Sequence, residues 1–407
     1  MLIKRARHVN HAKTSRRPRR SPAAGPIEAS LPTLGRTLRT PGDGHPRNPS
    51  QGRSPTNCSD THAPQAPGLH PVPGSPLRQP KDCRPRIHTS SRRAPVLLPD
   101  GGITVNNPVL QRIRATDGTE LAYRQIGPPT APLTVVFLHG FCLTMDAWLP
   151  QARHLSAALG NTARLVLYDH RGHGHSDVPA DYATYTLAQL GDDLASIITA
   201  LSPDRPVVLV GHSMGGMAAL AFAARHPEMV RQIAGIALIS TAAGRLDTCG
   251  LGRALATPAV PLMQYCTRLA PGIATRMWAL ARNTIAPLMG VPVTANQALH
   301  ANQACCRMIS RTPITTIAGL LTTFRTHDET AALPSLAHLP AFVACGSDDK
   351  ITPLQHSLDL AAALPGADFL QVPGAGHMLE LERPQQVNAG LLRLVARAQN
   401  NRVMAHA

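Results

Sequence analysis

Three polar residues, far apart in the sequence, carry the groups that nucleophilic catalysis requires. Ser213 stands between Gly211 and Gly215 in a Gly-Xaa-Ser-Xaa-Gly pentapeptide, Asp349 is the second of two adjacent aspartates, and His377 follows a Gly-Ala-Gly turn. A serine hydroxyl is a weak nucleophile, so it needs an imidazole to accept its proton and a carboxylate to hold that imidazole in the productive tautomer. The three residue types therefore predict a hydrolytic triad.

The segment around the serine predicts a sharp turn between a strand and a helix. Residues 207–210 are apolar and follow a proline, and from Met214 onward small and apolar residues recur at helical spacing until Pro227. A nucleophile in such a turn has a strained backbone and an exposed hydroxyl, and flanking glycines leave it room. The structural alternative is a plain or phosphate-binding strand–helix turn.

The acid and the base follow two later apolar runs. The first, at 341–344, leads into a loop with Asp348 and Asp349, at the sheet edge where ligands bind in open α/β sheets. Either carboxylate could orient an imidazole, and a helix N-cap or a surface turn is the alternative role. His377 follows the second run, at 369–372, and the glycines before it free its side chain to reach a serine.

Two backbone N–H groups are candidates for stabilising negative charge on a substrate oxygen. An apolar run at 135–138 leads into His139-Gly140-Phe141, and the turn at Gly140 can point the N–H of Phe141 into the site. The N–H of Met214 opens the predicted helix on the opposite side. Two such donors form an oxyanion hole, and removing one typically costs about 3 kcal/mol of transition-state stabilisation.

The remaining pattern predicts an α/β fold that positions these loops. A hairpin is expected around the turn at Asp117-Gly118, followed by short apolar runs at 134–138, 164–168, 207–210, 233–239, 341–344 and 369–372. Most runs lack alternation and are separated by helical stretches. We therefore expect a mostly parallel central sheet with helices on both faces.

The rhythm of strands and helices is interrupted between residues 246 and 338. This stretch is rich in Ala, Leu, Met and Thr, contains several prolines and has no clear strand, so it predicts short helices inserted as a cap or lid. The alternative is an ordinary helical layer. The predicted organisation is a tail at 1–95, a core at 96–245, the cap at 246–338 and the rest of the core at 339–400.

The charge of the 407-residue chain is concentrated in the first 95 residues. They hold 18 of the 40 Lys and Arg, 4 of the 24 Asp and Glu, and no aromatic residue, whereas the other residues hold 22 basic and 20 acidic side chains. Such a composition predicts a disordered tail. A basic tail could contact nucleic acid or an anionic membrane, but no aromatic residues are interleaved for base stacking. Deletion of the tail and a salt-dependent binding assay would test a nucleic-acid tether.

The eight cysteines are scattered and have no spacing typical of a disulfide framework or a zinc site. We expect free thiols and neither a metal nor an organic cofactor. No apolar run reaches the length of a transmembrane helix, and the tail lacks the apolar core of a signal peptide. A cytoplasmic location is therefore expected.

The motifs together resemble those of the α/β-hydrolase fold superfamily over residues 96–397. The matching stretches are L-H-G-F, Y-D-H-R-G-H-G-H-S, G-H-S-M-G-G, G-S-D-D-K-I-T-P and G-A-G-H-M. The resemblance implies that the acid is Asp349, with Asp348 as a fallback and Asp247 as a third choice. It also implies a structural role for the loop at 169–176. A serine as nucleophile argues against the family members that use an aspartate there.

The resemblance implies a serine esterase or lipase-like enzyme with a helical cap, acting on carboxylic esters with an apolar acyl or alcohol group. Thioesterases and C–C bond hydrolases use the same triad, so they stay open as alternatives. A non-catalytic binding protein on a hydrolase scaffold is a further alternative, because a fold does not by itself specify a function.

Overall fold

The computed structural model describes residues 108–246, 253, 255, 257–288 and 295–406. The predicted tail at 1–95 and the third-choice acid Asp247 lie outside these residues. Three further expectations stay predictions: the cap boundaries at 246 and 338, the role of the tail and the cytoplasmic location.

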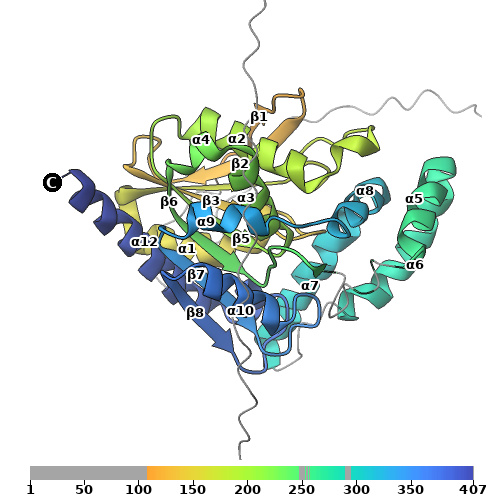
Figure 1. The fold of residues 1–407 in the computed structure, drawn as a ribbon. Coiled ribbons are helices and arrows are strands. Elements are labelled where there is room, and N and C mark those ends of the chain that lie inside the picture. Colours follow the sequence, from red (N-terminus) through yellow and green to blue (C-terminus); the bar gives the residue numbers. More distant parts are fainter. Residues whose placement is uncertain (1–107, 247–252, 254, 256, 289–294, 407) are drawn as a thin grey trace, which may run out of the picture. The chain divides into compact units, whose positions relative to one another are not determined.

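Within the described residues, eight strands form one sheet in the order β1-β2-β4-β3-β5-β6-β7-β8 (Figure 1). β2 pairs antiparallel with β1 and β4, and the other neighbouring strands are parallel. The predicted hairpin and mostly parallel sheet are thus confirmed. The strands are β1 (Gln111–Arg114), β2 (Glu120–Ile126), β3 (Leu133–Leu138), β4 (Ala163–Tyr168), β5 (Val207–His212), β6 (Ile233–Ile239), β7 (Ala341–Gly346) and β8 (Ala367–Val372).

Helices cover both faces of the sheet because alternate strand residues point in opposite directions. Val136 and Leu209 pack in one apolar cluster with α2 (Leu187–Leu201) and α3 (Met214–Arg225). Val135 and Val208 pack in a second cluster with α1 (Leu149–Leu159) and α12 (Pro384–His406). The central strands are buried on both faces, which explains their unbroken apolar sequences.

Among the described residues, the four longest helices between β6 and β7 are α5 (Ala259–Leu269), α6 (Pro271–Leu288), α7 (Ala295–Arg311) and α8 (Ile314–Phe324). The sequence predicted short helices here, but α6 and α7 have 18 and 17 residues. Pro258, Pro261 and Pro271 lie at the N-terminal ends of α5 and α6, where a helix does not use the backbone N–H. Pro287 lies in the last turn of α6, so no proline interrupts the interior of these helices. The remaining helices are α4 (Pro227–Val230), α9 (Leu333–Leu336), α10 (Leu354–Ala363) and α11 (Leu379–Glu382), with short 3-10 turns at Met145–Trp148, Gly160–Thr162, Tyr182–Thr184 and Thr330–Ala332.

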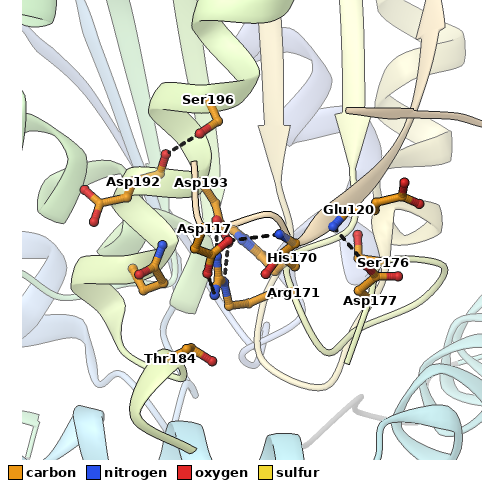
Figure 2. Close-up of polar contacts among 12 residues, drawn as sticks. Asp117, Glu120, His170, Arg171, Ser176, Asp177, Thr184, Asp192, Asp193 and Ser196 are labelled. Carbon is orange, nitrogen blue, oxygen red and sulfur yellow. Dashed lines mark hydrogen bonds and ion pairs between the residues drawn. The ribbon is translucent and has the colours of Figure 1, made fainter. Parts of the chain in front are cut away.

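A buried ion pair anchors the loop that follows β4. Figure 2 shows the guanidinium of Arg171 between Asp193 of α2 and Asp117 of the β1–β2 turn. The side chains of Arg171 and Asp193 are fully buried, whereas that of Asp117 is partly exposed. The paired guanidinium therefore joins the hairpin, α2 and the loop at 169–176, which the resemblance described as structural.

Candidate active site

The chain turns sharply at Ser213, which lies between the end of β5 and the first residue of α3. Ser213 has φ 50° and ψ −118°, a conformation that a residue with a side chain adopts only under strain. Backbone hydrogen bonds hold it there: the Ser213 N–H donates to the Ile239 carbonyl (3.0 Å), and the Ser213 carbonyl accepts the N–H of Gly216 (2.9 Å). The sequence-predicted elbow is present, and its strain is confined to one residue.

The two elbow glycines are required by close backbone contacts. A Cβ at Gly215 would lie 2.2 Å from the carbonyl oxygen of Leu138 in β3, and a Cβ at Gly211 would lie 2.5 Å from the backbone nitrogen of Gly216. Neither backbone can retreat without moving α3 away from the sheet. The glycines therefore bring α3 against β3, which places the serine beside the loop that follows β3.

The structure brings together the three residues from which the sequence predicted a triad. The Nε2 atom of His377 lies 3.0 Å from the Oγ of Ser213, and its Nδ1 lies 2.8 Å from the Oδ2 of Asp349. All three residues are buried, and Ser213 is the most exposed of them, with 8% of its surface accessible to solvent. In the resting arrangement Nδ1–H donates to the carboxylate, which leaves the lone pair of Nε2 facing the hydroxyl.

Asp349 is held as an anion by four donors. Besides His377 Nδ1, its carboxylate accepts the N–H groups of Ile351 and Thr352 and the hydroxyl of Thr352, each at 2.9 Å. Burial raises the pKa of Asp349, but the neighbouring His377 and the backbone donors outweigh burial and lower that pKa below its usual value. The neighbouring Asp348 is exposed and accepts from the Ser347 hydroxyl, so the fallback acid is not beside the imidazole.

Among the described residues, no group accepts a hydrogen bond from the backbone N–H of Phe141 or of Met214. Met214 opens α3 directly after the serine, and Phe141 lines the same cavity as Ser213 and His377. Two unused donors at this place are what an oxyanion hole requires.

The rings of two buried histidines, His139 and His173, support the loop that carries Phe141. The Nε2 of His173 accepts the N–H of Cys142 (3.2 Å), and the Nε2 of His139 accepts the N–H of His170 (3.0 Å). Burial lowers the pKa of His170 to about 3 and that of His173 to about 4, and it lowers the pKa of His139 well below 6.5. The three rings are therefore neutral, and those of His139 and His173 accept backbone N–H groups, a role that the sequence motif alone did not reveal.

Sequence analysis also missed two glutamates on α11, just after the histidine. The carboxylate of Glu382 accepts the N–H groups of Gly376 (2.8 Å) and Met378 (3.2 Å), on both sides of His377. Glu380 is fully buried, and its Oε1 lies 3.3 Å from the Nδ1 of His212. The spacing of two acidic residues before Pro384 was the only available signal, and it does not distinguish a buried carboxyl from an exposed one.

His212 connects the serine turn to the histidine loop. Its Nε2 lies 2.9 Å from the carbonyl oxygen of His377, so Nε2 carries the proton and Nδ1 faces Glu380 as an acceptor. Burial lowers the pKa of His212 to about 3 and raises that of Glu380 to about 8. Both groups are therefore neutral at pH 7, so the 3.3 Å contact between Glu380 and His212 is not an ion pair.

A cavity of about 190 Å³ opens beside Ser213 and His377. Side chains of α8, Leu321 and Phe324, form part of its wall together with Phe141. The other lining residues are His212, Met217, Leu246, Leu255, Ile351, Thr352 and Met378. The hydroxyl and the imidazole thus face a small, mainly apolar space.

Among the described residues, no group of three or more His, Cys, Asp and Glu side chains is placed to hold a metal ion. None of the cysteines in this part of the chain forms a disulfide bond. No helix within the described ranges is long and apolar enough to cross a membrane.

Comparison with known proteins identifies a family model, relatives in sequence and similar solved structures. The sequence model of the alpha/beta hydrolase fold matches residues 134–384. The chain is 28% identical over 281 residues to the "Putative carbamate hydrolase RutD" of Caulobacter sp. (strain K31), with 66% of this chain and 93% of that protein covered. It is 28% identical over 265 residues to the "Putative non-heme bromoperoxidase BpoC" of Mycobacterium tuberculosis, with 64% and 93% covered. A thermophilic esterase from Thermogutta terrifontis is similar in structure, with a TM-score of 0.58, 25% identity, and 71% of this chain and 99% of that chain covered.

Proposed function

Because this chain belongs to the α/β-hydrolase fold family, we propose that it is a serine hydrolase that cleaves small carboxylic esters through an acyl-enzyme intermediate. The observation that carries this proposal is the continuous hydrogen-bonded series from Asp349 through His377 to Ser213. The Thermogutta esterase shares the fold at 25% identity, which supports the assignment to ester chemistry.

In the acylation step, the Oγ of Ser213 attacks the ester carbonyl while the Nε2 of His377 accepts the serine proton. Asp349 is already ionised, so it stabilises the imidazolium as that cation forms. The negative charge that develops on the carbonyl oxygen is accepted by the N–H groups of Phe141 and Met214. These donors have no competing protein partner among the described residues, so no existing hydrogen bond must break first.

Collapse of the tetrahedral intermediate transfers the imidazolium proton to the leaving alcohol. In the deacylation step, the same imidazole removes a proton from a water molecule, which attacks the acyl carbon. The bond to Ser213 Oγ then breaks, the serine recovers its proton, and the acid is released. No step requires a metal ion or an organic cofactor.

The cavity limits the size of the substrate. A cavity of about 190 Å³ is only slightly larger than the ~150 Å³ cavities that hold a benzene molecule. Its walls are mainly apolar and include Phe324, Leu321 and Met217. We therefore propose short acyl or aryl esters as substrates.

A carbamate is the second candidate substrate class. The chain matches 93% of the length of a relative that is named "Putative carbamate hydrolase RutD". A carbamate carbonyl would be attacked by the same serine. Thioesters and C–C bonds of dienol-type diketones are the further classes that a shared triad leaves open.

The test combines an active-serine probe with a substrate panel. The purified protein and its Ser213→Ala variant are treated with a fluorophosphonate, and the labelled residue is mapped by mass spectrometry. Labelling at Ser213 that the variant lacks, together with turnover of short esters above carbamates, thioesters and diketones, is the expected result. A well-folded protein that neither labels nor turns over any panel member would overturn the proposal in favour of a binding protein.

A further inference from the structure

Large apolar side chains are exposed on two consecutive helices of the segment between β6 and β7. Among the described residues, ten large hydrophobic side chains are exposed, and six of them lie within residues 262–280. They are Leu262, Tyr265 and Leu269 on α5, and Ile273, Met277 and Leu280 on α6, each between 61% and 73% exposed. We name these six residues the exposed apolar surface. Such a concentration in a folded protein marks an interaction site.

The exposed residues of α5 are spaced as i, i+3 and i+7, so they lie in one row along the helix. The opposite side of α5 is buried through Val260 and Thr267, and α5 packs against α8. Packing against the protein uses one face of α5, and the row of Leu262, Tyr265 and Leu269 forms a second, apolar face. That second face is therefore available for a partner outside the described part of the chain.

The exposed apolar residues of α6 also lie in one row along their helix. Ile273, Met277 and Leu280 are spaced as i, i+4 and i+7, and only Ala270 separates the two helices. The neighbouring Trp278 is partly buried and packs with the apolar cluster that includes Cys305 and Met308 of α7. Both helices thus present one face to the protein and expose a second apolar row.

The charge of this segment identifies the partner. Residues 248–327 contain seven arginines, no lysine and no acidic residue, whereas the rest of residues 96–407 contains 15 basic and 20 acidic side chains. Arg268 and Arg276 are exposed on the same two helices as the apolar rows. An apolar row flanked by arginines is the pattern of a helix that lies in the surface of an anionic membrane.

We propose that the exposed apolar surface docks this protein onto the surface of an anionic phospholipid bilayer. The apolar side chains enter the boundary between headgroups and acyl chains, and the nearby arginines add electrostatic attraction to anionic lipid. A second copy of this segment would bring two positive surfaces together, and the basic tail at 1–95 is positive as well. Both are disfavoured as occupants by like-charge repulsion.

The exposed apolar surface lies close to the candidate active site. α5 packs against α8, and α8 contributes Leu321 and Phe324 to the cavity wall. The proposal does not depend on the proposed function. It concerns where the protein binds and not which bond it cleaves, so its test does not use catalytic activity.

The experiment measures co-sedimentation of the full chain with vesicles of phosphatidylcholine alone or of phosphatidylcholine and phosphatidylglycerol in equal amounts. One variant carries Leu269→Asp and Met277→Asp, one change on each helix. The matched control carries Val178→Asp and Leu358→Asp, which alter exposed apolar residues elsewhere. Thermal melting verifies that all three proteins are folded, and sedimentation equilibrium without lipid reports self-association.

We expect the wild-type chain and the control variant to bind anionic vesicles at least about tenfold more tightly than neutral ones, and the surface variant to lose at least about tenfold in affinity. Equal binding of the surface variant and the wild-type chain would assign the binding to another region, such as the tail, and overturn the proposal. Failure of the wild-type chain to bind would also overturn it. So would self-association of the wild-type chain that the surface variant abolishes, because the occupant would then be a second copy.

Discussion

Glu382 holds His377 in place without touching its side chain. The two carboxylate oxygens of Glu382 accept the N–H groups of the residues on either side of the histidine, Gly376 at 2.8 Å and Met378 at 3.2 Å. A glycine turn that gives His377 the reach to approach Ser213 would by itself leave the loop many conformations. The two hydrogen bonds to Glu382, which we call the Glu382 clamp, restrict the conformation of this loop. The imidazole is therefore positioned before a substrate binds.

Replacing Glu382 by Gln should lower kcat, because the amide end of Gln presents N–H groups where one of two backbone donors needs an acceptor. A misplacement of the imidazole by about 1 Å can cost about a hundredfold in rate, with little change in KM. The measurement is steady-state turnover of the best ester in the panel, together with the rate of fluorophosphonate labelling. Glu228→Gln, on an exposed side chain, is the control, and an unchanged kcat in Glu382→Gln would show that the clamp has no positioning role.

Asp349→Asn and Asp348→Asn form a matched pair of neighbouring changes. Asn at 349 can present an N–H to Nδ1 of His377 and so favour the wrong tautomer, and the expected loss in kcat is about 10⁴-fold. Asp348 is exposed and bonded to Ser347, so Asp348→Asn should keep nearly wild-type turnover. If the larger loss followed Asp348→Asn, the assignment of the acid would be reversed.

Glu380→Gln should change how stability depends on pH. The pKa of Glu380 is raised from 4.5 to about 8 by burial, so the folded protein keeps a proton that the unfolded chain releases above pH 4.5. The contribution of Glu380 to the wild-type free energy of unfolding therefore falls as pH rises from 4.5 to 8, by at most about 1.4 kcal/mol per pH unit, and levels off above 8. Gln cannot ionise and avoids this loss.

Urea denaturation at several pH values tests this relationship. The difference in free energy of unfolding between Glu380→Gln and wild type should be smallest near pH 4.5 and should grow in favour of the variant up to pH 8. A difference that stays constant over that range would mean that Glu380 does not retain its proton in the folded protein.

Asp193→Ala and Asp192→Ala compare a buried and a partly exposed partner on the same helix (Figure 2). Loss of Asp193 leaves the buried guanidinium of Arg171 with only the partly exposed Asp117, and such a change typically costs about 3–5 kcal/mol. Asp192 pairs with Arg225 near the surface, where ion pairs contribute about 1 kcal/mol or less. Chemical denaturation measures both, and equal destabilisation would contradict this account.

Most of the fold could be read along the chain because its signals are local. Burial of a strand on both faces requires an unbroken apolar run, and the turn at Ser213 requires glycines within two residues of it, so both leave marks in the sequence. The length of α6 was underestimated because a proline in the sequence looks the same at a helix end as in its middle. Only the assembled structure shows which backbone N–H groups lack a partner.

The sequence by itself determined which residue types could do chemistry and the order in which Ser213, Asp349 and His377 occur. It left two adjacent aspartates open on residue pattern alone. Only the tertiary structure put the carboxylate of Asp349 within 2.8 Å of the imidazole and turned Asp348 to solvent. The supports, His173 for the Phe141 loop, Glu382 for the His377 loop and the pair of His212 and Glu380, were likewise decided there. Each depends on a contact between segments distant in the chain or on burial of a charged group, and neither leaves a local pattern in the sequence.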